Sequence, residues 1–544
     1  MPKVVLPLVY EYNTRGLFAT TGKDSRLVNG FYVPVQDRAK NQATWYVEKR
    51  PGWVSDSSTG TSLSGLYITE TLAAYVSSYL VAGADNSVIF RGTVNCGTTT
   101  GVVNSMLPFT WGATSYVMLG ANSGAGSGAI GWYLGENAST INLTFTGSIT
   151  SGQKTISGVA STTGVYVGQL LTQAALTAGT RIASISGTDV ITDTNAISTT
   201  AAATITKQPV SRIIDADFPA PEVLMYAELD GYVFSSDTNN RRIYNSDLNA
   251  VHSWGASNYI TVDSAIGEFR ALTRYKNYIV AFCEDGIQFF YNAGNTSGSP
   301  LSKVPQGTIT GIGGAYQMIS GTILLVSTLD NVYWYWNNAI YCFDGLSPKK
   351  ISTPDIDNIL AQRTINGPHQ GPFPYEMGFL YVGGKHLIYV SYAATDLQLF
   401  YDIETDKWTE AGFASGYRVN GIHGVSTGGR GVDYVISKTS YQDASTTYTL
   451  TVQTPRFNFG TNNRKRIKKV SLIADNQASG SAYLSWSTDD YATFSTTRTL
   501  DMTANEKSAR NFGVGRNWAF RVIHYDNTAF RAEGLEIEYD ELDN

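Results

Sequence analysis

Residues 278–291 read YIVAFCEDGIQFFY, in which two apolar, aromatic runs flank a short polar segment with a glycine. Aromatic and β-branched side chains suit a pleated, half-buried surface, and glycine supplies the backbone conformations that tight turns require. This stretch therefore predicts an antiparallel hairpin. Comparable runs recur from about Leu63 onward, including Thr322–Val326, Leu387–Tyr392 and Leu397–Tyr401. We expect many hairpins and few helices.

The hairpins recur with a loose period. Related segments end hairpin groups near Ile243, Phe289, Tyr341 and Leu399. Intervals of roughly 45 to 60 residues fit propeller blades of four short strands better than a sandwich. We predict an all-β fold, a β-propeller with an inserted small β domain and a C-terminal β module.

At 544 residues, the chain is longer than a single core usually supports. The predicted divisions are an N-terminal segment with the first propeller strands (1–137), the inserted small β domain (138–208), the propeller blades (209–445) and the C-terminal β module (446–544), which closes the propeller or forms a platform. The insertion is poor in charge but alternates like strands. In the last strand Leu535, Ile537 and Tyr539 alternate with acidic residues, which predicts one wet face.

Composition supports the β interpretation and limits the function classes. Charged residues make up 15% of the chain and aromatic residues 12%, and the formal net charge is −6. Bulk charge therefore gives no attraction to nucleic acid. The cysteines Cys96, Cys283 and Cys342 are far apart, so we expect free, mostly buried thiols in a reducing compartment. No apolar stretch resembles a signal peptide or a membrane span, and we expect a soluble protein made in the cytoplasm.

We predict no catalytic residues, no cofactor-binding residues and no metal ligands. Gly126, Gly128 and Gly131 form a lone GxGxxG, which we interpret as a hairpin loop because no helix start follows. The five histidines show no paired spacing and are expected at structural or surface positions: His252, His369, His386, His423 and His524. The carboxylate pairs Asp489/Asp490 and Asp402/Glu404 are interpreted as solvated turn residues.

Residues 487–494, STDDYATF, resemble the Asp-box of sialidases in Ser487, Asp489, Thr493 and Phe494. Tyr491 stands where that motif has glycine. In an Asp-box the short polar side chains lock a hairpin turn and lie away from the chemistry. We therefore expect a folding element here.

The strongest charge feature is the basic run Arg464, Lys465, Arg466, Lys468 and Lys469. Phosphate contact is one of three interpretations of this run. The others are a solvated edge strand protected from aggregation and pairing across a subunit interface. The acidic end is a plausible partner, within the chain or from a neighbour: Glu533, Glu536, Glu538, Asp540, Glu541 and Asp543.

Ordered blocks through most of the chain resemble one family, the packaged-DNA stabilisation proteins, also called tail hub or nozzle proteins, of short-tailed phages. The most specific block is YCFDGLSPKKISTPDIDNIL, Tyr341–Leu360, in which a GxxPxxIST string precedes a short helix. The other blocks are Val47–Trp53 (VEKRPGW), Ile213–Pro221, Leu229–Leu248, Ile266–Gly294, Leu397–Gly412 and Phe457–Val470. Gln288 departs from the family, where an acid is common, and the 138–208 insertion falls between blocks.

The resemblance implies a β-propeller subunit of a homo-hexameric ring below the portal and adaptor rings of a virion tail. Such a ring retains packaged DNA and forms the ejection channel, which makes the basic run a candidate for DNA-channel or subunit-interface contacts. It implies contacts with other tail proteins such as fibres or a needle, transient non-specific contact with double-stranded DNA, and assembly in the bacterial host cytoplasm. Two alternatives stay open: a propeller glycosidase or depolymerase, which needs an arginine cluster or paired carboxylates at a propeller mouth, and a glycan-binding adhesin of the tail.

Overall fold

The structure is a computed structural model in which strands form nearly all of the regular secondary structure. It describes residues 2–9, 25–37, 42–55, 80–82, 88–91, 94–99, 102–112, 114–122, 129–135, 142–219, 225–314, 324–328, 330–345, 347–362, 374–382, 384–392, 397–412, 417–419, 425–427, 434–437, 439–443 and 445–542.

Four consecutive groups of four antiparallel strands form the middle of the molecule. The first is β18 (Tyr226–Leu229), β19 (Tyr232–Asp237), β20 (Arg242–Asp247) and β21 (Ala250–Thr261); the second is β22 (Phe269–Tyr275), β23 (Tyr278–Cys283), β24 (Gly286–Asn292) and β25 (Leu301–Thr310). The third is β26 (Leu325–Ser327), β27 (Val332–Trp336), β28 (Ala339–Phe343) and β29 (Pro348–Lys350); the fourth is β30 (Pro374–Val382), β31 (Lys385–Tyr392), β32 (Leu397–Asp402) and β33 (Lys407–Gly412).

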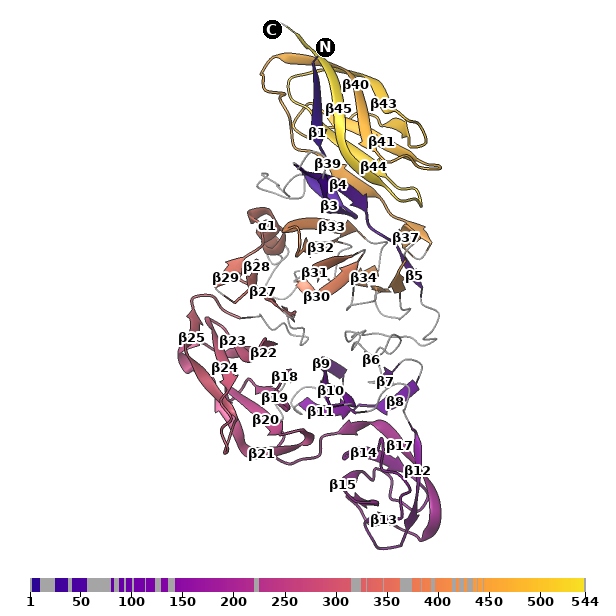
Figure 1. Cartoon of the computed structure of the whole chain (residues 1–544), viewed down its shortest axis with the longest axis vertical. Helices are drawn as coiled ribbons and strands as arrows, with labels where there is room; N and C mark the ends of the chain where they lie inside the picture. Colours follow the sequence, from indigo (N-terminus) through magenta and orange to yellow (C-terminus); the bar gives the residue numbers. More distant parts are fainter. Residues whose placement is uncertain are drawn as a thin grey trace.

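These groups are the blades of a β-propeller. The first strand of each blade contacts the first strand of the next, from β18 through β22 and β26 to β30. The blades therefore turn about a common axis (Figure 1). The hairpin predicted over residues 278–291 is confirmed as β23–β24, with Tyr278 opposite Tyr291. Five of the six β23 side chains are buried, because neighbouring blades cover both faces.

One blade turn shows how sequence sets local geometry. Asp230 and Gly231 connect β18 to β19, and both have positive φ, 53° and 82°. Two consecutive residues with positive φ form a tight turn whose twist matches the twist of the two strands that it joins. Asp-Gly is among the residue pairs that favour this turn. The turn thus fixes the pairing of Leu229 with Tyr232.

Strands from distant parts of the chain extend this series of blades. The hairpin of β34 (Tyr417–Val419) with β35 (Val425–Thr427) and the antiparallel pair of β36 (Tyr434–Ile436) with β5 (Trp53–Ser55) follow the fourth blade. In the second, Trp53 lies opposite Ile436, so an early strand pairs with a late one. The remaining strands are β6 (Leu80–Ala82), β7 (Val88–Arg91), β8 (Val94–Thr98), β9 (Val102–Trp111), β10 (Thr114–Asn122) and β11 (Ala129–Leu134), and β9 contacts β18.

The inserted domain extends away from the end that carries both termini (Figure 1). Its strands are β12 (Thr144–Ile149), β13 (Thr155–Ser157), β14 (Gln169–Thr172), β15 (Ile182–Ser186), β16 (Asp189–Thr192) and β17 (Thr200–Arg212). A separate hydrophobic cluster forms its core and includes Ile182 and Ile205. Strand β17 pairs with β12 near its start and with β11 of the propeller at its end. The long strand therefore anchors the domain.

Strands from both ends of the chain build the C-terminal module. One sheet contains β1 (Lys3–Pro7), β3 (Gly30–Asp37), β4 (Gln42–Lys49), β40 (Arg464–Ala474), β43 (Lys507–Gly515) and β45 (Arg531–Leu542). The other contains β39 (Leu450–Gln453), β44 (Ala519–His524), β41 (Ser481–Ser487) and β42 (Arg498–Asp501), and β2 (Arg26–Val28) joins it to β33. Their inner faces enclose a shared core. The predicted wet face of the last strand is confirmed, since Leu535 and Ile537 are buried and Glu536 and Glu538 are not.

The short helix expected after the GxxPxxIST string is present as α1 (Pro354–Gln362). Ser352 Oγ donates to Asp357 Oδ1 at 2.5 Å, and Ile356 N donates to Thr353 Oγ1 at 3.4 Å. Thr353 thus accepts an amide that the first helical turn leaves free, and Ser352 holds the carboxylate of Asp357 in that turn. The residues of the string therefore start the helix through hydrogen bonds to nearby residues of the same segment.

We predict that Ile182→Ala unfolds the inserted domain without disturbing the C-terminal module. Ile182 is fully buried in the domain's own core, and removing such a side chain costs about 2–5 kcal/mol. Limited proteolysis with mass spectrometry should show new cleavage within residues 142–199 only. Ile197→Ala is the matched control, because Ile197 is 63% exposed and should leave the digest unchanged. Equal cleavage of both variants would contradict a separate core.

Candidate functional site

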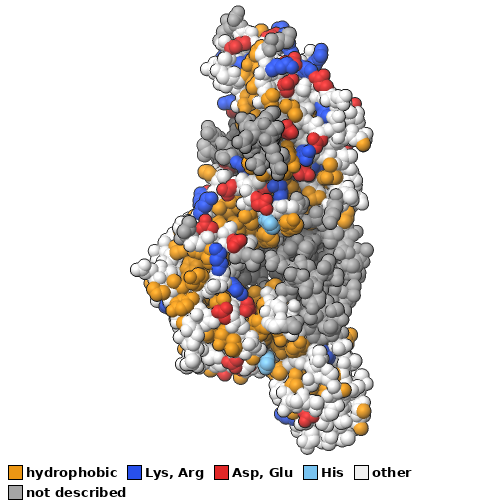
Figure 2. Space-filling model, viewed as in Figure 1, with side chains coloured by type: hydrophobic (Ala, Val, Ile, Leu, Met, Phe, Trp, Pro, Cys, Tyr) orange, Lys and Arg blue, Asp and Glu red, His pale blue; other side chains and the backbone are white. Residues whose placement is uncertain are grey.

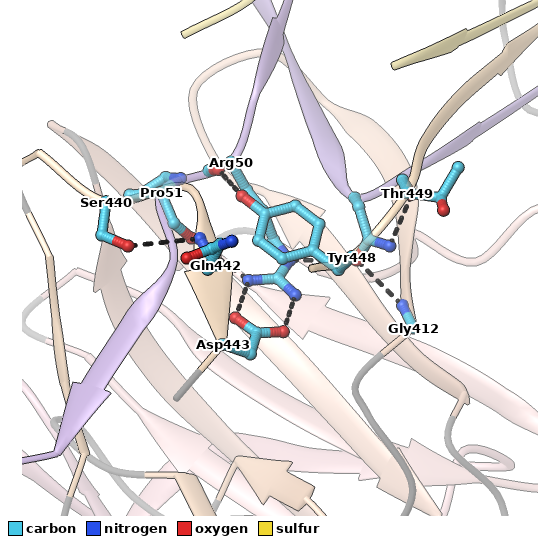
Figure 3. A network of polar contacts seen from close by, with 9 residues as sticks. Arg50, Pro51, Gly412, Ser440, Gln442, Asp443, Tyr448 and Thr449 are labelled. Atoms are coloured by element: carbon cyan, nitrogen blue, oxygen red, sulfur yellow. Dashed lines mark hydrogen bonds and ion pairs between the residues drawn. The ribbon is translucent and has the colours of Figure 1, made fainter. Parts of the chain in front are cut away.

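A buried arginine lies where the N-terminal segment meets the start of the C-terminal module. Arg50 donates from its two terminal guanidinium nitrogens to the two carboxylate oxygens of Asp443, at 2.9 and 2.5 Å. Its guanidinium carbon lies 3.8 Å from the centre of the Tyr448 ring. Figure 3 shows the carboxylate and the ring meeting this one guanidinium. Arg50 and Asp443 are 2% and 1% exposed, so this is a fully desolvated, two-pronged ion pair.

Asn29 extends this network to a propeller blade. Arg50 Nε donates to Asn29 Oδ1 at 2.9 Å, and the same oxygen accepts the Gly412 amide, at the end of β33, at 3.0 Å. Asn29 Nδ2 donates to the Thr449 carbonyl at 2.8 Å. One set of contacts thus joins the N-terminal segment, the fourth blade and the segment that leads into β39. We call Asn29, Arg50, Asp443 and Tyr448 the closing junction.

Gly52 brings the two backbones of the closing junction together. Its amide donates to the Ser440 carbonyl and its carbonyl accepts the Ser437 amide, both at 2.8 Å. A Cβ atom at this position would lie 2.2 Å from the Gln442 carbonyl oxygen, so only glycine fits. Arg50 and Gly52 of the block VEKRPGW (Val47–Trp53) therefore have structural roles in the fold. Nothing in the sequence pattern identified Asp443 or Tyr448 as their partners.

The basic run lies on β40, and two of its lysines form ion pairs within the chain. Lys468 Nζ lies 2.6 Å from Asp540 Oδ2 on the neighbouring strand β45. Lys469 forms an ion pair with Glu506. Figure 2 shows basic and acidic side chains interspersed over this end of the molecule. The acidic end thus supplies partners from the same chain, although Asp543 lies outside the described residues.

Two interpretations of the basic run need correction. Strand β40 is not an edge strand, because β43 and β45 flank it on its two sides. Lys465 cannot make a surface contact in this fold, since its side chain is fully buried and Nζ donates to the carbonyls of Thr461 and Arg516. Burial lowers the pKa of Lys465. Arg464 and Arg466 keep exposed side chains, and Lys468 and Lys469 are partly exposed.

The Asp-box is confirmed as a hairpin lock. It connects β41 to β42, and Asp489 Oδ1 accepts the Ser487 hydroxyl at 2.7 Å and the Thr493 amide at 3.0 Å. Hydrogen bonds from Thr493 and Ser487 lower the pKa of Asp489 to about 2. Tyr491 takes the glycine position of the motif with φ 64°, and its hydroxyl donates to the Thr454 carbonyl at 3.1 Å. The side chains of Ser487, Asp489, Tyr491 and Thr493 are therefore used for structure.

The carboxylate pair Asp402/Glu404 was wrongly predicted to be solvated throughout. Asp402 is 4% exposed and lies 2.7 Å from the Lys385 ammonium. Its other oxygen accepts the amides of Glu404 and Thr405 and so shapes the β32–β33 turn. Asp490 is exposed and pairs with Arg456 at 2.9 Å. Both pairs belong to turns.

The glycine motif and the histidines occupy scattered positions. Gly131 lies in strand β11, whereas Gly126 and Gly128, like His369 and His423, lie outside the described residues. His386 is exposed, with Nδ1 3.1 Å from Glu404 Oε1. Burial lowers the pKa of His252. Within the described part of the chain, no group of three or more His, Cys, Asp or Glu side chains could hold a metal ion.

The three cysteines are free and buried, as predicted. Burial raises the pKa of Cys283 to about 12 and that of Cys342 to about 11, so neither is a thiolate near neutral pH. Among the described residues, no helix is long and apolar enough to cross a membrane.

Comparison with known proteins finds no matching family model and no matching curated protein. The chain is similar to the dihydro-heme d1 dehydrogenase NirN in complex with DHE, at 10% identity and a TM-score of 0.32, over 86% of this chain and 82% of that one. It is also similar to AztD of Citrobacter koseri, at 9% identity and a TM-score of 0.30, over 86% of this chain and 98% of that one. A third similar structure is Trypanosoma rangeli sialidase, at 8% identity and a TM-score of 0.26, over 99% of this chain and 97% of that one. At TM-scores this low we draw no conclusion from these likenesses.

We predict that Asp443→Ala destabilises the protein by about 3–5 kcal/mol, because it leaves the Arg50 guanidinium buried without its counter-charge. Urea unfolding followed by tryptophan fluorescence measures the change. Arg456→Ala is the control, since it breaks an exposed ion pair with Asp490 and should cost about 0–1 kcal/mol. The double variant Arg50→Met/Asp443→Leu should recover part of the loss. If Asp443→Ala costs no more than the control, the closing junction does not stabilise the fold.

Proposed function

We propose that this chain is a structural virion protein of a short-tailed phage, a tail nozzle or hub ring. It docks below the portal and adaptor rings, seals in the packaged DNA and forms the ejection channel. The observation that carries the proposal is the position of the blocks that resemble that family. Arg50 and Gly52 of VEKRPGW build the closing junction, and Ser352 and Thr353 of the GxxPxxIST string start helix α1.

These blocks contribute to architecture. Arg50 is 2% exposed, and Gly52 is held against the Gln442 backbone, so neither faces a substrate. A resemblance concentrated in buried pairs and turns supports a protein selected for shape and assembly more than it supports an enzyme. A protein's function depends on its sites more than on its fold, and the sites that these blocks form are structural.

The distribution of charge supports a channel that lets DNA slide. Each phosphate that a protein neutralises adds salt-dependent affinity, so a densely cationic lining would hold the duplex. Lys468 and Lys469 are paired with Asp540 and Glu506, and Lys465 is buried. Six copies at −6 each give a ring with a formal charge of −36. The ring is proposed to contact duplex DNA transiently and without sequence preference.

The proposed partners follow from this role. The chain forms a homo-hexamer, contacts the portal–adaptor ring, and carries other tail proteins such as fibres or a needle. Its place is the virion tail, after synthesis and assembly in the bacterial host cytoplasm. The inserted domain projects from the propeller on the side away from the chain termini, a position free to face outward (Figure 1).

Native mass spectrometry of the purified chain, alone and mixed with portal–adaptor complexes, tests the assembly. We expect six chains per portal–adaptor complex, whether or not rings form without the adaptor. The same samples, incubated with capsular and sialylated glycans, test the alternatives. A persistent monomer that ignores the adaptor and binds or cleaves a glycan would overturn the proposal.

We predict weak binding of the assembled ring to duplex DNA, with a Kd no tighter than the roughly 10⁻⁶ M of ordinary non-specific binding at physiological salt. Fluorescence anisotropy over a salt series measures it. Arg464→Ser/Arg466→Ser should lower the residual salt dependence, whereas Lys465→Met should leave it unchanged because Lys465 is buried. Tight, strongly salt-dependent binding by the ring would count against a sliding channel.

A further inference from the structure

His524 is a buried, incompletely satisfied imidazole next to the closing junction. It ends strand β44, opposite Leu450 of β39, and it is 0% exposed. Its ring packs on Phe530 with 4.9 Å between centroids, and Nε2 lies 3.3 Å from Thr528 Oγ1. Nδ1 is buried without a hydrogen-bond partner. The site therefore suits a neutral imidazole, because a proton added to Nδ1 would have no hydrogen-bond acceptor.

A buried lysine lies on the strand that leads into the same junction. Lys49, the last residue of β4, is 1% exposed and directly precedes Arg50. Its ammonium donates to the Asp526 carbonyl at 2.7 Å and lies 4.7 Å from the centre of the Tyr448 ring. A carbonyl and a ring face stabilise an ammonium less than a carboxylate does. Lys49 thus brings an imperfectly compensated positive charge near His524.

The charged groups that face His524 come from two elements. Lys49 approaches from β4, and Asp526 lies in the turn after β44. One Asp526 oxygen already accepts the Ser481 amide at 2.7 Å. Behind Lys49 lie Arg50 and Asp443, which pair with each other. The remaining neighbours are apolar or neutral: Leu450, Phe530 and Thr528, the last bonded to Gln477 at 3.0 Å.

The electrostatics of this cluster agree with its geometry. Burial, followed by the charge of Lys49, lowers the pKa of His524 to about 4. Burial and the charge of Arg50 lower the pKa of Lys49 to about 8. Both groups therefore resist carrying a positive charge in the folded protein, as expected for cations removed from water.

We propose that His524 is the proton-sensitive element of a latch that holds the C-terminal module to the closing junction and loosens in mild acid. A protonated imidazole would place a second cation beside Lys49, with Asp526 the carboxylate at hand. Loosening of the latch would separate β4 from β39 and β44. Lys49 lies on β4, and its contacts Tyr448 and Asp526 lie in the segments next to β39 and β44. Opening these contacts hydrates the imidazole and releases it to its ordinary pKa.

Acid favours the form of the protein that binds more protons. The pKa of His524 is about 4 in the fold and about 6.5 in an opened, hydrated form, so the opened form binds the proton first. The stability that the neutral His524 gives to the closed latch is therefore fully present above about pH 6.5 and is lost as the pH falls from there toward 4. One proton taken up on opening raises the opening equilibrium by about 30-fold between pH 7.5 and pH 5.

Hydrogen–deuterium exchange of the full chain at pH 7.5 and pH 5, corrected for intrinsic exchange rates, tests this latch. We expect residues 45–50, 446–453 and 519–532 to lose protection by about 30-fold at pH 5, while the blade strands β22–β24 keep theirs. His524→Gln, which keeps a group that can bond Thr528 but cannot gain a proton, should abolish the difference. His386→Gln, at an exposed histidine, should retain it.

A second measurement applies even if His524→Gln does not fold. The C2 proton resonances of the five histidines are followed by NMR from pH 8 to the onset of opening, and the resonance of His524 should not shift in the range of an exposed histidine. His252→Gln assigns the half-buried ring of His252. Equal loss of protection in the wild type and His524→Gln would overturn the latch. So would titration of His524 between pH 6 and pH 7 in the closed protein.

Discussion

The buried ion pair between Arg50 and Asp443 is the constraint on which the rest of the structure depends. A propeller assembled from distant strands needs its two ends joined, and here the join is between β5 and β36. The pair lies beside that join and extends through Asn29 to the fourth blade. Because a buried pair is costly to separate but adds little over an apolar contact, its main effect is to specify one arrangement of these segments.

Strand β2, next to this junction, makes the C-terminal module continuous with the propeller. Strand β2 lies between β33 of the fourth blade and β39 of the module, so one hydrogen-bonded sheet runs through both. Strands β1, β3 and β4 complete the module's other sheet from the N-terminal side. A load applied to the module would therefore pass into the propeller through backbone hydrogen bonds.

The sequence predicted what is local and missed what is distant. Hairpins such as β23–β24 were visible because apolar runs and turn residues lie within one stretch, and helix α1 and the Asp-box turn carry their own capping side chains. The partnership of Arg50 with Asp443 spans 393 positions, and no spacing rule encodes it. Burial of Lys465 and Asp402 was missed because a charged residue normally signals solvent, unless a partner elsewhere in the fold compensates it.

The central claim is that this propeller works as a ring around DNA, and electron cryomicroscopy of the chain bound to portal and adaptor rings tests it most directly. We predict six copies around the portal axis, with an open channel in line with the portal and the inserted domains projecting outward. A single copy, or propellers bound off the axis with no continuous channel, would contradict the account.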